Sequence, residues 1–457
     1  MSGEKKNTAG LVGVMMVSVL YLAVLALGGG YVTVKRSANG GSWWRPFGIV
    51  SPSDADGSEE QPDKLAVTST AVISVMGDMM GHMPTVTAAY DPTEKVYNFD
   101  NIFTYISPYV SEADYAVANL ETTLRGTLGG AKYQGYPCFN TPDSYADALQ
   151  KAGFDMLLTA NNHSYDTGAK GMQRTLEVLD KKNIAHTGTF LNEDEKRYLV
   201  EEVNGIKIGM ICYTYETDGT DSSRKYLNGL LMTKEAAPLI NSFSYQRPNE
   251  FYDELSGHIA AMRAEGAEEI MLFIHWGDEY HTAPNAYQKR MAQKIGDLGV
   301  DVIVGGHPHV IQPADLLTSS DGTRQIFCIY SLGNAVSNQR ADRAAIKTGH
   351  TEDGALLNVT FTKYSDGRVI VSDVNLLPTW VDLRTDKQTG RKIYRIVPLD
   401  PSVKDWGTAF EMSAATVKKA KASYERTAAI TDEGMEQAQS YYRSAAAAIL
   451  SDSDWAA

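Results

Sequence analysis

The sequence has little cysteine and no excess of positive charge. Only three of its 457 residues are cysteines. Cys212 and Cys328 lie inside apolar runs, so we expect buried small side chains rather than a disulfide framework. The 56 acidic residues outnumber the 42 basic ones, and the resulting charge of −14 argues against a nucleic-acid-binding protein. An anionic substrate would therefore need local positive charge, which metal ions can supply.

Charged residues are also missing from one long stretch near the N-terminus. None occurs from Asn7 to Val34, and this predominantly apolar stretch is long enough to cross a bilayer. We expect a short cytoplasmic N-terminus over residues 1–7 and a transmembrane anchor over residues 8–34. The main domain would then lie outside the cytoplasm, held at the cell membrane by a single pass. A cleaved signal peptide is the alternative.

An acidic linker is predicted over residues 35–65. Its second half lacks apolar periodicity and carries several acidic residues that repel one another. Strand-like and helix-like runs then alternate through a domain predicted over residues 66–380. Apolar runs on both sides of Asn204-Gly205 predict a hairpin. This mixture of crossovers and hairpins predicts an α/β domain with mixed sheets.

Helices are predicted over Asn101–Glu112, Asp143–Ala152, Gly168–Lys182 and Ala286–Leu298. Residues 381–457 are expected to form a C-terminal helical extension. Its alanine-rich segment Phe410–Leu450 predicts one or two helices. The extension either packs on the main domain or projects from it as an interaction element.

Polar side chains follow several predicted strands, at the point where each apolar run ends. These residues are Asp78, Glu121, Asn162, His163, His275, His307 and His309. In sheets with helical crossovers, ligands gather at the carboxyl ends of the strands, so we expect these side chains to share one site. In extended backbone, residues two apart point the same way, so His307 and His309 can aim their rings at one spot.

These residue types suit a dinuclear metal centre. Two divalent ions held about 3.5–4 Å apart can clamp the attacking and leaving oxygens of a displacement. Glu121 is the candidate for a carboxylate that bridges both ions, with Asp78, the Asn162 amide oxygen and three of the histidines as further ligands. No proposed ligand is a thiolate, so this donor set suits Mn, Fe or Zn.

A proton donor for the leaving group is predicted next to these ligands. His163 is adjacent to Asn162, so it can face the substrate while Asn162 faces the metal. Asp166 could orient His163 or cap the helix that begins at Gly168. The further candidates for substrate contact are Asn119, Glu279, Tyr280, Ser331 and Asn334.

Six blocks occur in order along this part of the chain. They are Gly77-Asp78, Asn119-Leu120-Glu121, Ala160–Gly168, His275–Tyr280, Gly306–Gln312 and Tyr330–Asn334. Together they resemble the signature set of the CapA (PgsA) family of bacterial poly-γ-glutamate capsule biosynthesis proteins, which belongs to the calcineurin-like metallophosphatase superfamily. The resemblance implies a two-sheet α/β sandwich flanked by helices, with a dinuclear metal centre at its edge.

The superfamily pattern also implies individual roles. It would give one ion to Asp78 and His309, the other to Asn162, His275 and His307, the bridge to Glu121 and general acid catalysis to His163.

The chain departs from this pattern at two positions. The superfamily usually has a histidine two residues after the first aspartate, where this chain has Met80. His82 could substitute if the loop bends back. The superfamily's bridging residue is usually aspartate, whereas glutamate, as at Glu121, is the choice of CapA-type proteins.

The resemblance implies a membrane-anchored, extracytoplasmic protein that acts in capsule or poly-γ-glutamate synthesis through metal-dependent hydrolysis of a phosphoester or an amide. Its expected partners are an anionic cell-surface polymer or its precursor, and subunits of a membrane synthase. Two alternatives stay open. One is a non-catalytic polymer-handling subunit of a membrane synthase complex, and the other is a surface phosphatase or nucleotidase.

Overall fold

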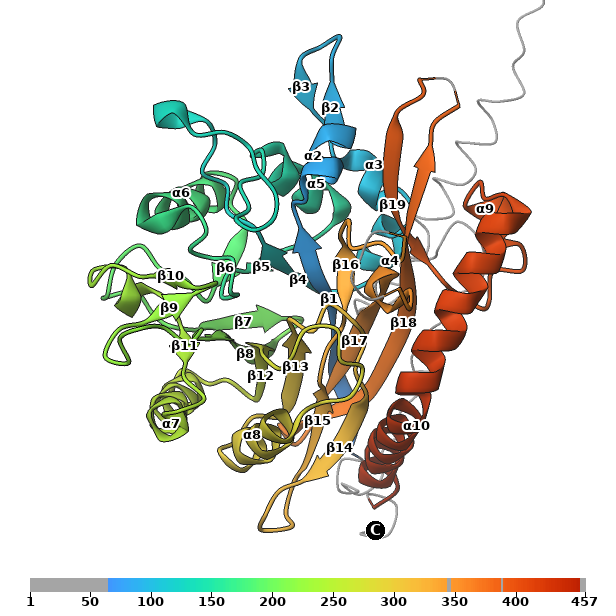
Figure 1. The fold of residues 1–457 in the computed structure, drawn as a ribbon. Coiled ribbons are helices and arrows are strands. Elements are labelled where there is room, and N and C mark those ends of the chain that lie inside the picture. The colour runs from blue at the N-terminus through green and yellow to red at the C-terminus, as the bar shows by residue number, and fades with distance from the viewer. Residues whose placement is uncertain (1–64, 343–346, 388, 453–457) are drawn as a thin grey trace, which may run out of the picture. The chain divides into compact units, whose positions relative to one another are not determined.

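A computed structural model describes residues 65–342, 347–387 and 389–452 (Figure 1). The predicted anchor over residues 8–34 and residues 35–64 of the predicted linker lie outside this range. Within the described residues, no helix has both the length and the apolar composition needed to span a membrane.

Two mixed β-sheets form the body of the described part. The first has eight strands in the order β19-β18-β17-β1-β4-β5-β6, with β16 also paired to β1. Their bounds are β1 (Val67–Met80), β4 (Tyr115–Glu121), β5 (Met156–Leu158), β6 (Ala185–Thr187), β16 (Asn334–Val336), β17 (Asp353–Tyr364), β18 (Val369–Thr385) and β19 (Lys392–Pro398).

The second sheet has seven strands in the order β11-β8-β12-β13-β15-β14, with β7 also paired to β8. Their bounds are β7 (Leu199–Val203), β8 (Ile206–Tyr215), β11 (Ser242–Phe243), β12 (Glu269–His275), β13 (Val302–Gly306), β14 (Ala314–Thr318) and β15 (Gln325–Ile329). Two small two-stranded pairs lie outside the main sheets, β2 (Tyr90–Asp91) with β3 (Val96–Tyr97) and β9 (Tyr226–Leu227) with β10 (Leu230–Leu231).

Strand direction decides where polar side chains can meet. Strands β1, β4, β5 and β6 are parallel neighbours, and so are β8, β12, β13 and β15. Helices α5 (Ser144–Ala152) and α6 (Gly168–Lys181) supply the crossovers from β4 to β5 and from β5 to β6. The carboxyl ends of parallel strands face the same edge of each sheet, so residues that follow them gather there.

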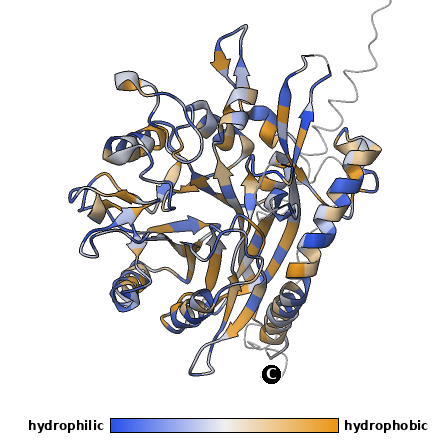
Figure 2. Cartoon of the chain, viewed as in Figure 1, coloured by the Kyte–Doolittle hydropathy of each residue, from blue (hydrophilic) through white to orange (hydrophobic). Residues whose placement is uncertain are grey.

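The core lies between the two sheets, because alternate residues of each strand point inward. It includes Ile73, Val75, Val117 and Leu357 from the first sheet and Met210, Phe273, Val304 and Ile329 from the second. The intervening residues of the second sheet, such as Leu272 and Ile303, pack instead against α7 (Pro248–Ala264) and α8 (Ala286–Asp297). Strands are accordingly rich in hydrophobic residues, whereas the connecting loops are mostly hydrophilic (Figure 2).

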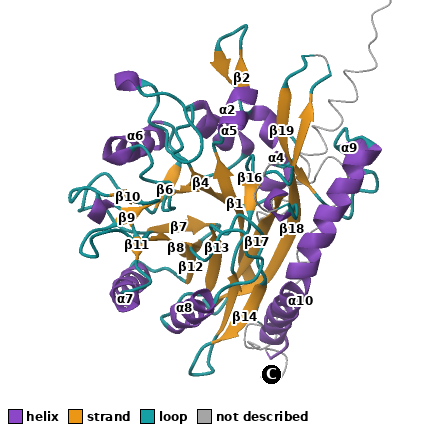
Figure 3. Cartoon of the chain, in the orientation of Figure 1, coloured by secondary structure: helices purple, strands orange, loops and turns teal. Residues whose placement is uncertain are grey.

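The architecture is the mixed α/β, two-sheet arrangement with a C-terminal helix that the sequence predicts (Figure 3). The hairpin at Asn204-Gly205 is confirmed as the antiparallel pair β7–β8. The single helix predicted over Asn101–Glu112 is wrong. That segment forms two short helices, α3 (Asp100–Phe103) and α4 (Ser107–Val110), and Pro108 lies in the first turn of the second, where proline is tolerated.

The C-terminal part begins later than predicted. Strand β18 runs through residue 381, where the helical extension was expected to begin, and β19 adds another strand to the sheet. The helical part comprises α9 (Trp406–Ala409) and α10 (Ala414–Asp452), of 39 residues. The remaining helix, α2 (Met83–Ala89), follows β1.

Helix α10 packs on the sandwich, lying along β18 and β14 (Figure 1). Met435, Ala438 and Tyr442 of this helix belong to the core between the sheets. Near its start, Arg426 donates to both carboxylate oxygens of the buried Asp353, which also accepts a bond from Ser423. These contacts favour the packed alternative over a projecting interaction element.

The adjacent tyrosines of α10 test this packing. Tyr442 is 4% exposed and Tyr441 is 42% exposed. Replacing Tyr442 by Ala is expected to lower the free energy of unfolding by about 3 kcal/mol, because it empties core volume. Tyr441→Ala, the matched control, is expected to change it by less than about 1 kcal/mol. Equal effects of the two substitutions in chemical denaturation would contradict the packing of α10 on the core.

Candidate metal centre

Seven polar side chains converge at the carboxyl ends of strands from both sheets. Asp78, Glu121, Asn162 and His163 come from β1, β4 and the loop after β5, whereas His275, His307 and His309 come from β12 and the loop after β13. All seven are buried, with exposed fractions of 3% or less. The structure therefore brings together every ligand and acid candidate that the sequence predicts, although their roles stay predictions.

Two glycines allow these strand ends to approach closely. A Cβ atom at Gly77, just before Asp78, would lie 2.1 Å from the Gly333 carbonyl oxygen, and one at Gly305 would lie 2.0 Å from the Tyr330 carbonyl oxygen. Beyond β13 the backbone is strained, since His307 and His309 have φ values of 94° and 58°. Such strain is typical of functional sites that the surrounding fold holds in place.

Asp78 is the most extensively hydrogen-bonded carboxylate of the cluster. Its Oδ1 accepts a bond of 2.8 Å from Asn119 Nδ2, and its Oδ2 lies 3.2 Å from His309 Nδ1. Burial disfavours the charge on Asp78. The hydrogen bond from His309 and the nearby imidazoles of His275 and His309 outweigh burial, and they hold the pKa of Asp78 below its ordinary value.

Glu121 is fully buried, and neither of its carboxylate oxygens has a hydrogen-bond partner among the described residues. Its Oε1 lies 3.6 Å from His275 Nε2, 3.8 Å from His309 Nε2 and 3.9 Å from His163 Nε2. Burial, followed by the neighbouring Asp78 carboxylate, raises the pKa of Glu121 well above its ordinary value.

These separations are too long for hydrogen bonds, but they suit a coordination sphere. Donors about 2.0–2.2 Å from one metal ion lie about 3–4 Å from each other.

Two of the histidines, His275 and His307, are in the neutral form that binds metal ions. Burial lowers the pKa of His275 to about 3 and that of His307 well below its ordinary value, so both rings are neutral. Only the neutral imidazole can donate a lone pair to a metal ion. His275 Nε2 lies 2.9 Å from the Asn162 Oδ1, and His307 Nδ1 is buried with no partner in the described part of the chain.

His163 is oriented by Asp166. The Nδ1 atom of His163 lies 2.7 Å from Asp166 Oδ2, which also accepts a bond from the Phe139 backbone N–H. The alternative of a helix cap is not what the structure shows, since α6 has Thr167 as its N-cap and no side-chain cap bond. With Nδ1 held in this way, His163 presents Nε2 toward Glu121.

The sequence analysis missed Asn228, which holds Asp166 from the other side. Asn228 Nδ2 donates to Asp166 Oδ1 over 3.0 Å and to the Pro137 carbonyl over 2.8 Å. Asn228-Gly229 forms the turn between β9 and β10, with both residues at positive φ. Asn-Gly is a strong hairpin signal, but nothing in the sequence links this turn to Asp166.

The substrate-contact candidates lie around the cluster in different ways. Asn119 connects Asp78 to Asn161, whose Nδ2 donates to Asn119 Oδ1 over 3.0 Å. Asn334 Nδ2 donates to the His309 carbonyl, so Asn334 supports the metal-site loop. Ser331 accepts a bond from the Gly333 N–H inside a buried turn. Only two candidates reach the outer side of the cluster: Glu279, exposed, and Tyr280, half-buried.

Met80 and His82 lie where the chain departs from the superfamily pattern, and neither joins the candidate ligands. Met80 is buried and offers no hard donor. His82 Nδ1 accepts a bond of 3.3 Å from the Asn338 N–H, and the His82 ring packs edge-on against Phe139. His82 belongs to neither group of candidate ligands that the described residues form, Asp78–Glu121–His275 and Glu279–His307–His309.

Divalent metal ions fit this site. The Glu121 oxygens and His307 Nδ1 are buried and have no hydrogen-bond partner among the described residues, so a metal ion would use lone pairs that are otherwise unpaired. Bound ions would also compensate the charge of the two buried carboxylates, Asp78 and Glu121. The mixture of oxygen and imidazole donors suits Mn, Fe or Zn.

The chain was also compared with known proteins. A family model described as "Bacterial capsule synthesis protein PGA_cap" matches residues 72–339. The chain is 28% identical over 279 residues to the capsule biosynthesis protein CapA of Bacillus anthracis, covering 59% of this chain and 63% of that protein. It is 28% identical over 279 residues to the PGA biosynthesis protein CapA of Bacillus subtilis, covering 61% and 65%. The chain thus covers slightly less than two thirds of either relative.

A more distant similarity is to the NAD 5'-nucleotidase of Haemophilus influenzae. It is 29% identical over 180 residues, which make up 38% of this chain and 25% of that protein.

Replacing Glu121 by Gln separates metal binding from folding. The metal-free variant is expected to be about as stable as the parent, because glutamine has nearly the size of glutamate and, like the protonated carboxyl group, carries no charge. Mn(II) at 100 times its Kd should stabilise the parent by about 2.7 kcal/mol and the variant by much less. Chemical denaturation with and without Mn(II) measures both effects. Glu202→Gln, on the exposed side of β7, is the matched control, and equal stabilisation of Glu121→Gln and parent would contradict a ligand role for Glu121.

Proposed function

Because the chain belongs to the bacterial capsule synthesis protein (PGA_cap) family, we propose that it acts in making, trimming or exporting a cell-surface capsule polymer. The polymer would be poly-γ-glutamate or a related anionic chain, and the reaction a metal-dependent hydrolysis of a phosphoester or an amide. The observation that supports hydrolysis is the buried cluster of carboxylate, amide and imidazole donors around Glu121.

The chain's own residues divide the work. Asp78, Glu121, Asn162, His275, His307 and His309 would hold the pair of ions. When bound, such ions polarise the scissile group and make water nucleophilic near neutral pH. An anionic polymer approaching a chain of charge −14 would find its local positive charge at this site.

His163 is placed to move a proton. Its Nδ1 is bound to Asp166, which fixes the orientation of the ring. Its Nε2 faces the metal-binding side of the cluster, 3.9 Å from Glu121 Oε1. A leaving group held at the ions would therefore receive its proton from Nε2, and Asn228 would keep Asp166 in position from the far side.

The proposed cellular setting follows from the sequence. The uncharged stretch over residues 8–34 would anchor the protein in the cell membrane with its main domain outside the cytoplasm. There it would meet the polymer and the subunits of a membrane synthase.

A surface phosphatase or nucleotidase is the second candidate function. It is supported by the similarity to the NAD 5'-nucleotidase of Haemophilus influenzae and by the fit of the site to phosphoester hydrolysis. Turnover of nucleotides or simple phosphodiesters, without action on poly-γ-glutamate oligomers, would favour this second candidate. No turnover of any of them by a metal-loaded chain would favour a non-catalytic polymer-handling subunit.

Replacing His163 by Ala tests the proton-transfer role. The variant is expected to lose about 10²–10⁴-fold in turnover while it keeps its metal, because general acid catalysis contributes an effect of that size. The assay measures hydrolysis of poly-γ-glutamate oligomers and phosphodiesters by the metal-loaded, full-length chain. His186→Ala is the matched control, since His186 pairs with Asp180 outside the cluster. Unchanged turnover in His163→Ala would remove His163 from the mechanism.

Asp166→Asn tests the support of His163. Asparagine keeps the size of the side chain but removes the charged acceptor that holds His163 Nδ1, so turnover should fall while the metal content stays unchanged. Unchanged turnover in a folded, metal-loaded Asp166→Asn variant would show that His163 does not need Asp166 for its role.

A further inference from the structure

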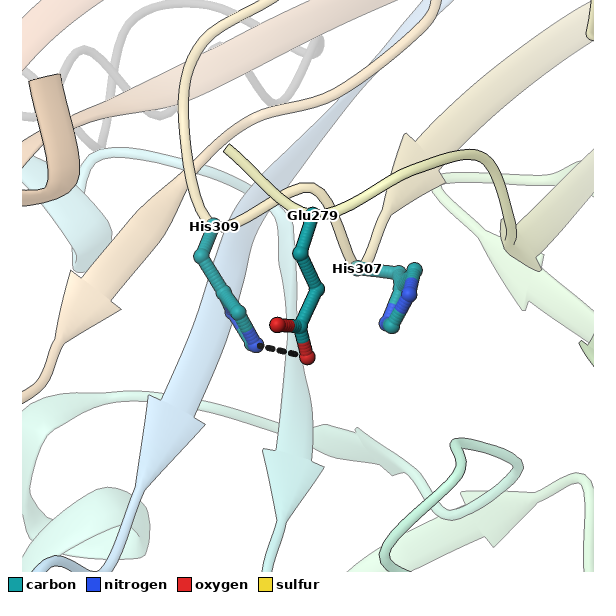
Figure 4. Close-up of side chains that lie close together, drawn as sticks. All are labelled: Glu279, His307 and His309. Atoms are coloured by element: carbon teal, nitrogen blue, oxygen red, sulfur yellow. Dashed lines mark ion pairs between the residues drawn. The ribbon is translucent and has the colours of Figure 1, made fainter. Parts of the chain in front are cut away.

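Glu279 lies at the outer side of the candidate metal centre, next to two buried histidines. One carboxylate oxygen of Glu279 and one ring nitrogen each of His307 and His309 lie within 4.8 Å of one another. Figure 4 shows Glu279 between the two histidines, with its Oε1 4.0 Å from His309 Nε2. His307 and His309 are 3% and 1% exposed, whereas the Glu279 side chain is 42% exposed.

The loop that carries Glu279 is fixed to the loop that carries the histidines. The Tyr280 N–H donates to the Pro308 carbonyl over 2.8 Å, and Pro308 lies between the two histidines in the chain. The Trp276 N–H donates to the Gly306 carbonyl over 3.1 Å. The backbone at Glu279 therefore keeps a defined position relative to His307 and His309.

Gly277 gives this loop its direction. Gly277 has a φ of 87°, and a Cβ atom there would lie 2.6 Å from the Gln288 side chain. Its N–H donates to the Tyr245 hydroxyl over 2.9 Å. The chain thus leaves β12 immediately after His275 and crosses over the cluster, which brings Glu279 back toward the site.

Two further observations concern the metal donors around Glu279, His307 and His309. His307 Nδ1 is buried and has no hydrogen-bond partner among the described residues. Met80, on the β1 side of the cluster, contributes no oxygen or nitrogen donor. A carboxylate from Glu279 would supply a donor on the side of the cluster that is open to solvent.

We infer that Glu279 is a further metal ligand, beside His307 and His309, in the candidate metal centre. This inference rests on the proposed metal-dependent function and changes the predicted role of Glu279 from substrate contact to ligand. A further carboxylate makes the site harder, which favours Mn(II) or Fe(II) among the candidate metals.

The test is Mn(II) binding to the metal-stripped, full-length chain, measured by isothermal titration calorimetry. Glu279→Gln is expected to weaken one of the two ions by about 10–100-fold and to leave the other unchanged. Asp278→Asn is the matched control, because Asp278 is the adjacent exposed acid and bonds Asn285 instead of the cluster. This control should bind both ions as the parent does.

Electron paramagnetic resonance gives an independent readout. The parent loaded with two Mn(II) ions is expected to show the spectrum of a spin-coupled pair, whereas Glu279→Gln at the same Mn(II) concentration should show isolated Mn(II). Glu279→Asp, which keeps the charge but shortens its reach, is the second variant if Glu279→Gln does not fold. It too should weaken one ion.

The outcomes separate the two proposals. Identical isotherms of the parent and a folded Glu279 variant would overturn the ligand role of Glu279 and leave the metal-dependent function standing. A folded parent that binds no Mn(II), Fe(II) or Zn(II) would overturn the metal-dependent function together with this inference.

Discussion

Glu121 carries both of its carboxylate oxygens into the space where the two sheets meet, and no hydrogen-bond donor among the described residues satisfies either oxygen. Burying an unpaired ionised carboxylate costs several kcal/mol, so without a cation the group holds its proton, as its raised pKa indicates. A divalent ion changes this balance, because it stabilises the carboxylate and uses the lone pairs of neutral imidazoles at once. Two other candidate ligands, His275 and His309, lie 3.6 Å and 3.8 Å from Glu121 Oε1, close enough to share such an ion.

The two-sheet architecture is what brings these buried polar side chains together. Asp78 and Glu121 leave parallel strands of one sheet, and His275 leaves a parallel strand of the other, so all three reach the same edge without long loops. The hydrophobic core, closed on one side by α10, holds the strands rigid. That rigidity sustains the strained backbone at His307 and His309, and it keeps His309 Nε2 3.8 Å from Glu121 Oε1.

The sequence was a good guide wherever a signal was local. Apolar runs that end in Asp, Glu, Asn or His identified the strand ends, and the topology brought them together. Contacts that depend on distant segments were not predictable. Asn228 donates a hydrogen bond to Asp166 from a turn about 60 residues further along the chain, and no residue pattern predicts that contact. The helix expected over Asn101–Glu112 was wrong because helical propensity does not show where packing interrupts a helix.

The metal content of the protein most directly tests the proposal that this cluster binds two metal ions. The full-length chain would be purified without chelators after supplementation with Mn, Fe or Zn, and its metal would be counted by mass spectrometry. We expect about two metal ions per folded parent chain and fewer than one per chain in Glu121→Gln. A well-folded chain that carries no ion under any of these conditions would contradict the proposal.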